Sequence, residues 1–247
     1  MKQITNIITI NTGYSKGKAV DILKKGGYEC LFLDFGRNQE SFIRNIAQGA
    51  DPGLAVEMMK DLGLVKEPEE TQDYRAAKPL FECLPSLEVS ASNLYCYKED
   101  ASLILSSDVA VRILLLTAKA RVGRVEAEEW KEVMRDDIYN EIEAAEGEAN
   151  YIVERAGKTN ICMGASEELV TSLSGSGFRV EEIVVDPPCK PLDLFATKIK
   201  MEMLKGEVVR EEEVERLVED HLRFVDLILE RGYDEAYKTW SRIFFSS

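Results

Sequence analysis

Polar and acidic residues stand at the ends of five apolar segments that we expect to form β-strands. The segments are residues 3–10, 29–33, 93–97, 159–163 and 179–185. At their ends stand Asn11, Thr12, Gly13, Tyr14 and Ser15, then Asp34, Gly36, Arg37 and Asn38, then Tyr97, Lys98, Glu99 and Asp100, then Gly164, Ala165, Ser166 and Glu167, and finally Asp186. Parallel strands bring their carboxyl ends to one edge of a sheet, where α/β proteins bind ligands. The sequence therefore predicts a polar, partly acidic cleft at that edge.

Two kinds of chemistry fit these side chains. Asp34, Asp100 and Glu167 are candidate catalytic residues, because like-charged neighbours raise the pKa of a carboxyl group and let it act as a base. Asp34, Asp100 and Asp186 are candidate ligands of a divalent metal, magnesium or manganese, which takes oxygen donors and can activate water. The side chains predicted to bind a small-molecule ligand are Thr12, Gly13, Tyr14, Arg37, Asn38, Tyr97, Lys98 and Ser166.

Structural roles compete with this interpretation. Asp100 and Ser166 stand where helices are expected to begin, and such residues cap free backbone amides. Asp186 precedes two prolines and fits an ordinary turn, whereas Asp34 and Arg37 could form a structural ion pair.

The apolar segments are nearly continuous rather than alternating, which is typical of strands covered on both faces. Each is followed by a helix-compatible segment, so we expect an α/β fold with a mainly parallel central sheet of about five strands flanked by helices. Residues 1–247 are expected to form a single domain, with residues 207–247 as a C-terminal helical extension.

Three helical segments bear on the packing and on partners. Residues 101–120 should pack on the sheet, and Arg112 interrupts an apolar stretch judged too short for a bilayer, so no membrane association is expected. The next helix repeats apolar residues every fourth position against an acidic face that we expect to be solvated: Trp130, Met134, Ile138 and Ile142. The tail carries an apolar stripe that either packs on its own chain or forms a homodimer; it comprises Val214, Leu217, Val218, His221, Leu222, Val225 and Ile228, with Tyr233, Tyr237, Trp240, Phe244 and Phe245 nearby.

Composition limits the function classes. The net charge of −14 argues against nucleic acid as a partner, because an acidic chain repels phosphates. The five cysteines form no C-x-x-C pair and indicate a reducing compartment, and the N-terminus lacks the pattern of a signal peptide, so a cytoplasmic protein is expected. His221 is the single histidine, which excludes a histidine-based triad or a multi-histidine metal site, and a packed role is the favoured interpretation.

Several well-known motifs are absent. The sequence has no G-x-G-x-x-G after the first strand, no P-loop and no G-x-S-x-G elbow. The segment "VVDPPCKP" is similar to the Asp-Pro-Pro-aromatic motif of base-modifying methyltransferases, with Cys189 in the aromatic position. A methyltransferase-like protein that uses S-adenosylmethionine is therefore the second alternative for the function.

The order of the strand-end motifs carries a family resemblance. The first strand ends in Thr12 and Gly13, the second in Asp34 with Arg37 shortly after, and a late strand in Gly-Ala-Ser followed by "ELVTSLSGSGFRVEEIVV". Over roughly residues 1–190 this order resembles the pheromone-shutdown (TraB/PrgY) and ChaN/erythromycin-esterase-like superfamily.

The resemblance implies a metal-assisted or histidine–glutamate hydrolytic cleft. In that family the first and the late strand each end in G-x-x-H, and the second strand ends in Glu. Here Tyr14 or Ser15 stands at the first histidine position, Glu167 at the second and Asp34 at the Glu, while Arg37 matches the arginine that follows. We therefore expect a divergent, hydrolase-like protein without the family histidines. The alternative is a non-catalytic binding or scaffold protein that forms a homo-oligomer through its C-terminal helices.

Overall fold

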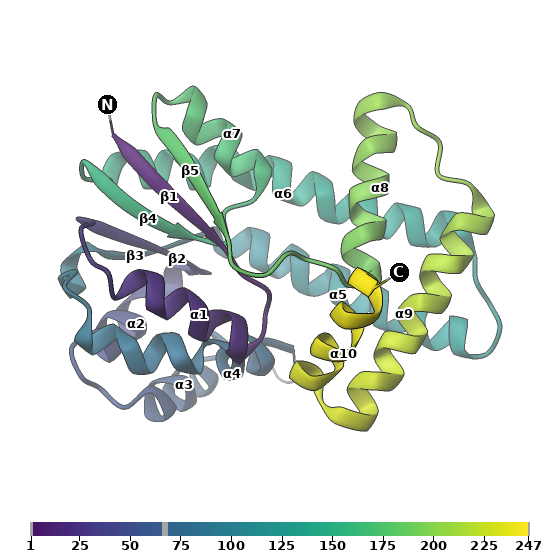
Figure 1. Cartoon of the computed structure of the whole chain (residues 1–247), viewed down its shortest axis with the longest axis horizontal. Helices are drawn as coiled ribbons and strands as arrows, with labels where there is room; N and C mark the ends of the chain where they lie inside the picture. Colours follow the sequence, from purple (N-terminus) through teal and green to yellow (C-terminus); the bar gives the residue numbers. More distant parts are fainter. Residues whose placement is uncertain (1, 66–68, 247) are drawn as a thin grey trace. The chain divides into compact units, whose positions relative to one another are not determined.

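The computed structural model of the chain describes residues 2–65 and 69–246, and it confirms the predicted α/β fold. Five parallel strands form one sheet in the order β3-β2-β4-β1-β5 (Figure 1). The strands are β1 Gln3–Ile8, β2 Cys30–Gly36, β3 Leu94–Lys98, β4 Thr159–Met163 and β5 Arg179–Val184.

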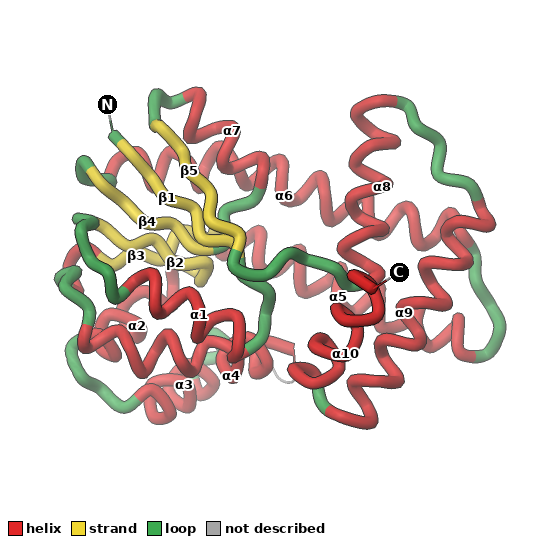
Figure 2. Tube along the Cα trace, in the orientation of Figure 1, coloured by secondary structure: helices red, strands yellow, loops and turns green. Residues whose placement is uncertain are grey.

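Helices make up most of the remaining described chain, as Figure 2 shows. They are α1 Gly13–Leu23, α2 Glu40–Ala47, α3 Pro52–Asp61, α4 Glu69–Cys83, α5 Asp100–Arg121, α6 Ala127–Arg155, α7 Glu167–Gly175, α8 Pro191–Lys205, α9 Glu211–Arg231 and α10 Tyr233–Ser246. Short 3₁₀ segments cover Arg37–Gln39, Leu84–Ser86 and Ala91–Asn93.

The chain divides into two compact units. The sheet unit comprises Met1–Asp100 and Ile142–Pro187, and the helical unit comprises Ala101–Glu141 and Pro188–Ser247. The C-terminal helices α9 and α10 belong to the helical unit together with α8, almost all of α5 and the first half of α6. Residues 207–247 are therefore one part of a larger helical unit in this structure.

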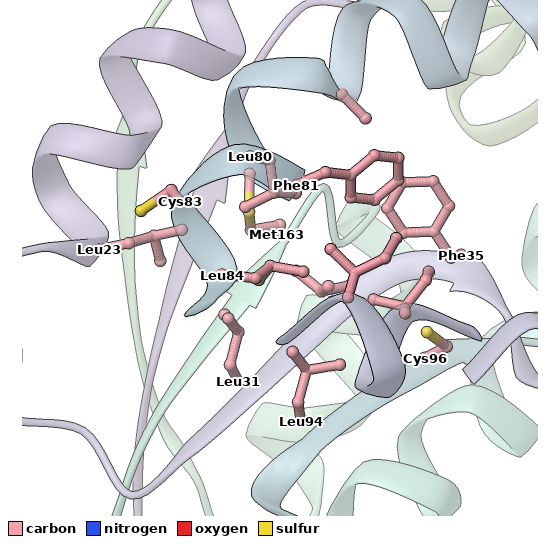
Figure 3. Packing of buried hydrophobic residues seen from close by; sticks show 14 of the residues in the cluster. Leu23, Leu31, Phe35, Leu80, Phe81, Cys83, Leu84, Leu94, Cys96 and Met163 are labelled. Carbon is pink, nitrogen blue, oxygen red and sulfur yellow. The ribbon is translucent and has the colours of Figure 1, made fainter. Parts of the chain in front are cut away.

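Apolar side chains on successive residues of the strands point to opposite faces of the sheet, and both faces are covered. Leu31 and Leu33 belong to a cluster with residues of α1, α2, α3 and α4, where Phe81 and Leu84 pack close to the strands (Figure 3). Phe32, between those two leucines, belongs to a second cluster with residues of α6 and α7. This two-sided burial explains the continuous apolar runs in the sequence, because neither face of a strand meets water.

The helical unit has its own core. Trp130, Met134 and Ile138 of α6 are buried with residues of α8 and α9, as their spacing predicts. Ile142, the fourth residue of that repeat, is 44% exposed, so the prediction is wrong for it. The tail stripe packs within this unit: Val214 and Val218 are fully buried, and Trp240 of α10 donates a hydrogen bond to the backbone oxygen of Cys189 at 2.9 Å.

Helix α5 differs from the prediction in two ways. Its buried residues, Val109, Leu116 and Ala120, belong to the core of the helical unit and not to either cluster on the sheet. The helix is also 22 residues long, and of the helices described it alone is long and apolar enough to cross a membrane. The expectation that this stretch is too short for a bilayer was therefore wrong, because Arg112 does not end the helix.

His221 is a packed histidine whose neutral form the fold stabilises. Its Nε2 lies 3.0 Å from the hydroxyl of Thr117, and its ring meets Trp130 edge-on. Burial, with a smaller contribution from Lys190 and Arg121, lowers the pKa of His221 from 6.5 to about 4. The unfolded chain therefore takes up a proton in a pH range in which the folded chain does not.

This pKa difference predicts a specific acid sensitivity. The loss of stability begins as the pH falls through 6.5 and is complete below about 4, and at pH 5 it amounts to roughly 2 kcal/mol. Urea unfolding at pH 7 and pH 5 should show this additional loss for the wild type and not for His221→Gln, which does not titrate. An equal loss in both proteins would contradict it.

Candidate functional site

The strand order places β1 and β4 side by side at the centre of the candidate site. Helix α1, which follows β1, packs on one face of the sheet, and α7, which follows β4, packs on the opposite face. In open α/β sheets, ligands bind in the crevice outside the carboxyl ends of two such neighbouring strands. The loops that follow β1 and β4 here are residues 9–12 and 164–166.

A β-bulge presents Asp34 at this edge. Leu33 of β2 pairs with Cys96, whereas Gly36 pairs with Lys98, so β2 has one more residue than β3 over this stretch. A bulge of this kind bends the strand and redirects a side chain. Asp34 therefore lies inside β2, which continues to Gly36, and not in the loop after it as the sequence predicts.

Lys16 is the ion-pair partner of Asp34, which corrects the predicted pairing with Arg37. The side chain of Thr12 caps α1 by accepting a hydrogen bond from the backbone amide of Ser15. This fixes the first turn of the helix, and from it Lys16 Nζ reaches Asp34 Oδ2 at 3.1 Å. Lys16 is only 6% exposed, and Asp34 Oδ1 is buried with no hydrogen-bond partner in the described part of the chain.

The turn after β4 allows Asp34 to come close. Gly164 has a φ of +71°, and a Cβ atom on it would lie 2.8 Å from Asp34 Oδ2. The next residue, Ala165, exchanges two hydrogen bonds of 3.0 Å with the buried side-chain amide of Asn6 in β1. The glycine in the "GAS" motif is thus required by both its backbone conformation and its closeness to the carboxylate.

A second buried ion pair lies beside β3. Lys98, the last residue of β3, lies 3.2 Å from Glu148 of α6, which is 1% exposed. Burial raises the pKa of Glu148, while Lys98 opposes that rise. Glu148 Oε1 is buried and, like Asp34 Oδ1, has no partner among the residues described. Glu148 was missed by the sequence analysis, which assigned the acidic residues of this helix to a solvated face.

Tyr97 and Cys162 are buried, and the carboxylates of both ion pairs affect their pKa values. The Tyr97 hydroxyl donates a hydrogen bond of 3.0 Å to the backbone oxygen of Met163. Burial raises the pKa of Tyr97 well above its ordinary value and also raises that of Cys162, and the Asp34 and Glu148 carboxylates add to both shifts. Both groups are therefore neutral at physiological pH, and neither serves as a nucleophile.

A third lysine–carboxylate pair stands at the end of β5. Lys18 of α1 lies 2.8 Å from Asp186, and the hydrogen bond to this carboxylate raises the pKa of Lys18. Lys18 also lies over the ring of Tyr14, 4.1 Å from its centre. Asp186 Oδ2 is again buried without a described partner. Asp186 is thus an ion-pair member rather than a simple turn residue.

Arg37, Asn38 and Asp100 hold the ends of β2 and β3 together. Arg37 donates hydrogen bonds to the backbone oxygens of Tyr97 and Gly147 and lies over the ring of Tyr151. The backbone amide of Asn38 donates to Asp100 Oδ1 at 3.2 Å. The Arg37 guanidinium thus binds two backbone oxygens, and it also lies 3.6 Å from Glu99, so these residues position the strand ends.

Ser166 caps α7, which confirms the structural role considered for it, since its hydroxyl accepts a hydrogen bond from the backbone amide of Leu169 at 3.3 Å. Glu167 is the first residue of that helix. Within the described residues, no group of three or more histidine, cysteine, aspartate or glutamate side chains is arranged to hold a metal ion. Lys16 and Lys18 pair with the carboxylates Asp34 and Asp186.

The sequence analysis missed three ion-pair partners, Lys16, Lys18 and Glu148, and the two buried ones, Lys16 and Glu148, carry a common signal. Lys16 lies on the face of α1 that buries Ala19, Val20 and Leu23, and Glu148 lies on a face of α6 with buried alanines. A charged residue at a buried helix position is rare unless it is paired. Helical periodicity could therefore have identified both.

A separate cleft of about 640 Å³ lies in the sheet unit between α3 and α4. Its lining combines the aromatic rings of Tyr74 and Phe81 with charged side chains such as Arg75 and Lys78. No strand-end residue lines it, so it is distinct from the edge at which Asp34 lies.

Comparison with known proteins does not identify the chain. No family model, no curated protein and no solved structure matches it.

Removing Lys16 should expose the cost of an unpaired carboxylate. Lys16→Met should lower the free energy of unfolding by about 2 kcal/mol, less than the loss for a fully buried pair because the Asp34 side chain is 27% exposed. Lys18→Met is the matched control, and it should cost less than about 1 kcal/mol because that lysine is 39% exposed. Adding Asp34→Asn to Lys16→Met should restore part of the lost stability, because it removes the unpaired charge. Urea unfolding gives the free energy of unfolding of the wild type, the two single lysine variants and the double variant.

Gly164→Ala tests the close approach of Asp34. The expected loss of stability is about 2 kcal/mol, because the positive φ costs about 1 kcal/mol and the new methyl group displaces the carboxylate. Gly177→Ala isolates the first cost, since Gly177 has a φ of +86° and nothing within 4 Å of a Cβ atom. Equal losses of stability in the two variants would show that a methyl group at position 164 does not clash with the Asp34 carboxylate.

Proposed function

We propose that this protein binds a small anionic molecule carrying hydroxyl groups at the carboxyl ends of its strands. One observation supports the proposal above the others. Three lysine–carboxylate pairs stand at the ends of β2, β3 and β5, and each keeps one buried carboxylate oxygen, on Asp34, Glu148 and Asp186, without a described partner.

The chemistry of the ligand follows from these oxygens. A buried acceptor without a hydrogen bond costs about 1–3 kcal/mol, so a ligand hydroxyl that donates to it gains affinity. The lysines supply the complementary charge: Lys16 and Lys18 lie in the first two turns of α1, whose first turn contains no acidic residue, so the positive end of the helix dipole is not neutralised there. A ligand with both an anionic group and hydroxyl groups matches both features.

The resemblance to the TraB/PrgY and ChaN/erythromycin-esterase-like superfamily supports hydrolysis as the reaction of the site. Asp34 and the glycine of the late-strand motif, which stand at corresponding motif positions, adjoin each other in this structure. Asp34 Oδ1 is the acceptor available for a proton from a ligand hydroxyl or water, and Glu148, whose pKa burial raises, is suited to hold a proton. A reducing, cytoplasmic location is part of the proposal, because the five cysteines are buried and the sequence has no C-x-x-C pair.

Ribose 5-phosphate, ribose and inorganic phosphate test the two halves of the proposal. Ribose 5-phosphate should raise the melting temperature most, by the equivalent of about 2.7 kcal/mol at a hundredfold excess over its Kd, because it alone carries both groups. Lys16→Met and Asp34→Asn should each remove most of the shift. Lys205→Met, which changes an exposed lysine of α8, should leave it intact.

Two other results would lead to a different conclusion about the ligand. No shift with any of the three compounds would contradict the proposal. A shift with manganese or magnesium that Asp34→Asn abolishes would support the metal site that the sequence suggests instead.

A further inference from the structure

Helix α5 exposes a continuous apolar face on the helical unit. Five of its large side chains, and a sixth just beyond its end, are between 47% and 73% exposed, in a chain of which 31% is charged. We call them the α5 stripe: Ile104, Leu105, Val111, Leu114, Leu115 and Val122, the last just beyond the end of the helix. The opposite side of α5 packs into the core of its own unit through Val109 and Leu116, so the helix is held while the stripe remains uncovered.

The spacing along the stripe is that of a coiled-coil seam. Exposed residues recur at positions 104, 108, 111, 115, 118 and 122, alternating steps of four and three. A repeat of 3.5 residues suits a second helix as the partner, because it keeps the seam facing another helix over several turns. Within this seam only Asp108 is charged, and Ala118 is the smallest side chain.

The seam is complementary to itself when a second copy runs antiparallel. Placing Ile104 opposite Val122 of the other copy also places Val111 opposite Leu115, and Asp108 opposite Ala118. The small alanine leaves room for the Asp108 carboxylate, which then lies next to the neighbouring cation Lys119. Each contact occurs twice across a two-fold axis, as in an isologous dimer.

The charges around the stripe are compatible with this pairing. Lys119 pairs with Glu129 at 2.7 Å within its own chain, and Arg121 with Asp226 at 2.5 Å, so Asp108 of a second copy would join existing ion pairs. Arg112, the basic residue closest to the axis, is neutralised by Asp136 of α6.

We propose that the α5 stripe is the interface of a homodimer in which two α5 helices pack antiparallel. This interface lies on the helical unit and involves no residue of the strand-end site. A second copy fits the stripe because the stripe is complementary to itself in both shape and charge.

A membrane is the competing occupant, since α5 is long and apolar enough to span one. Its neighbour α6 carries Glu129, Glu132 and Asp136, which form ion pairs with the basic residues of α5, and the chain has a net charge of −14. These carboxylates repel anionic lipids, so the surroundings of the stripe disfavour a lipid surface.

Light scattering coupled to size exclusion tests the dimer. The full chain should elute with twice its mass of 27.8 kDa. Leu115→Glu should raise the dimer dissociation constant at least about 100-fold, because it places two like charges in the centre of the seam. Leu229→Glu is the matched control: Leu229 is 75% exposed on α9, outside the stripe, and this variant should remain a dimer.

Engineered cysteines test the direction of the helices. Leu114 lies close to the two-fold axis, so Leu114→Cys should form an intermolecular disulfide on oxidation, whereas Val122→Cys should not. The five native cysteines are buried and should not interfere. The converse cross-linking pattern would overturn the antiparallel arrangement.

Three results would overturn the proposal as a whole. The wild type could be monomeric up to high micromolar concentration, Leu115→Glu could remain a folded dimer, or the wild type could float with vesicles of phosphatidylcholine and phosphatidylserine in a way that Leu115→Glu abolishes. Circular dichroism establishes that each variant is folded.

Discussion

The ion pair between Lys16 and Asp34 joins the first helix to the second strand, and the candidate site is arranged around it. A carboxylate so close to the backbone of β4 loses much of its hydration, and a nearby cation offsets that loss. Lys16 can reach it only because Thr12 caps α1 at the end of β1. The bulge in β2 and the glycine after β4 bring the carboxylate to the same place from the other side.

The fold class was predictable because two-sided burial leaves continuous apolar segments in the sequence. Strand order was not, because β1 pairs with β4 and β5, which lie more than 150 residues away in the chain. The division into two units was also beyond local patterns: the apolar residues of α5 look alike in the sequence whether they bury against a helix, as Leu116 does, or stay exposed, as Leu115 does.

The site was predicted in its location and only partly in its members. Asp34, Lys98 and Asp186 were chosen because they stand at strand ends, and each is a member of one of the three pairs. Their partners Lys16, Glu148 and Lys18 lie on helices, and choosing strand ends alone could not reveal them. Arg37 stands at the predicted position, but its guanidinium donates its hydrogen bonds to the backbone oxygens of Tyr97 and Gly147. No sequence pattern reveals those backbone contacts.

The position of β4 in the sheet has a consequence for biosynthesis. β4 separates β1 from β2, so those two strands, although adjacent in the chain, share no hydrogen bonds. As the chain leaves the ribosome, β1 therefore has no strand to pair with until residue 159 has emerged, by which time α5 and α6 are complete. Such late, distant pairing slows folding, and it leaves the apolar residues of β1 without their final partners while most of the chain is made.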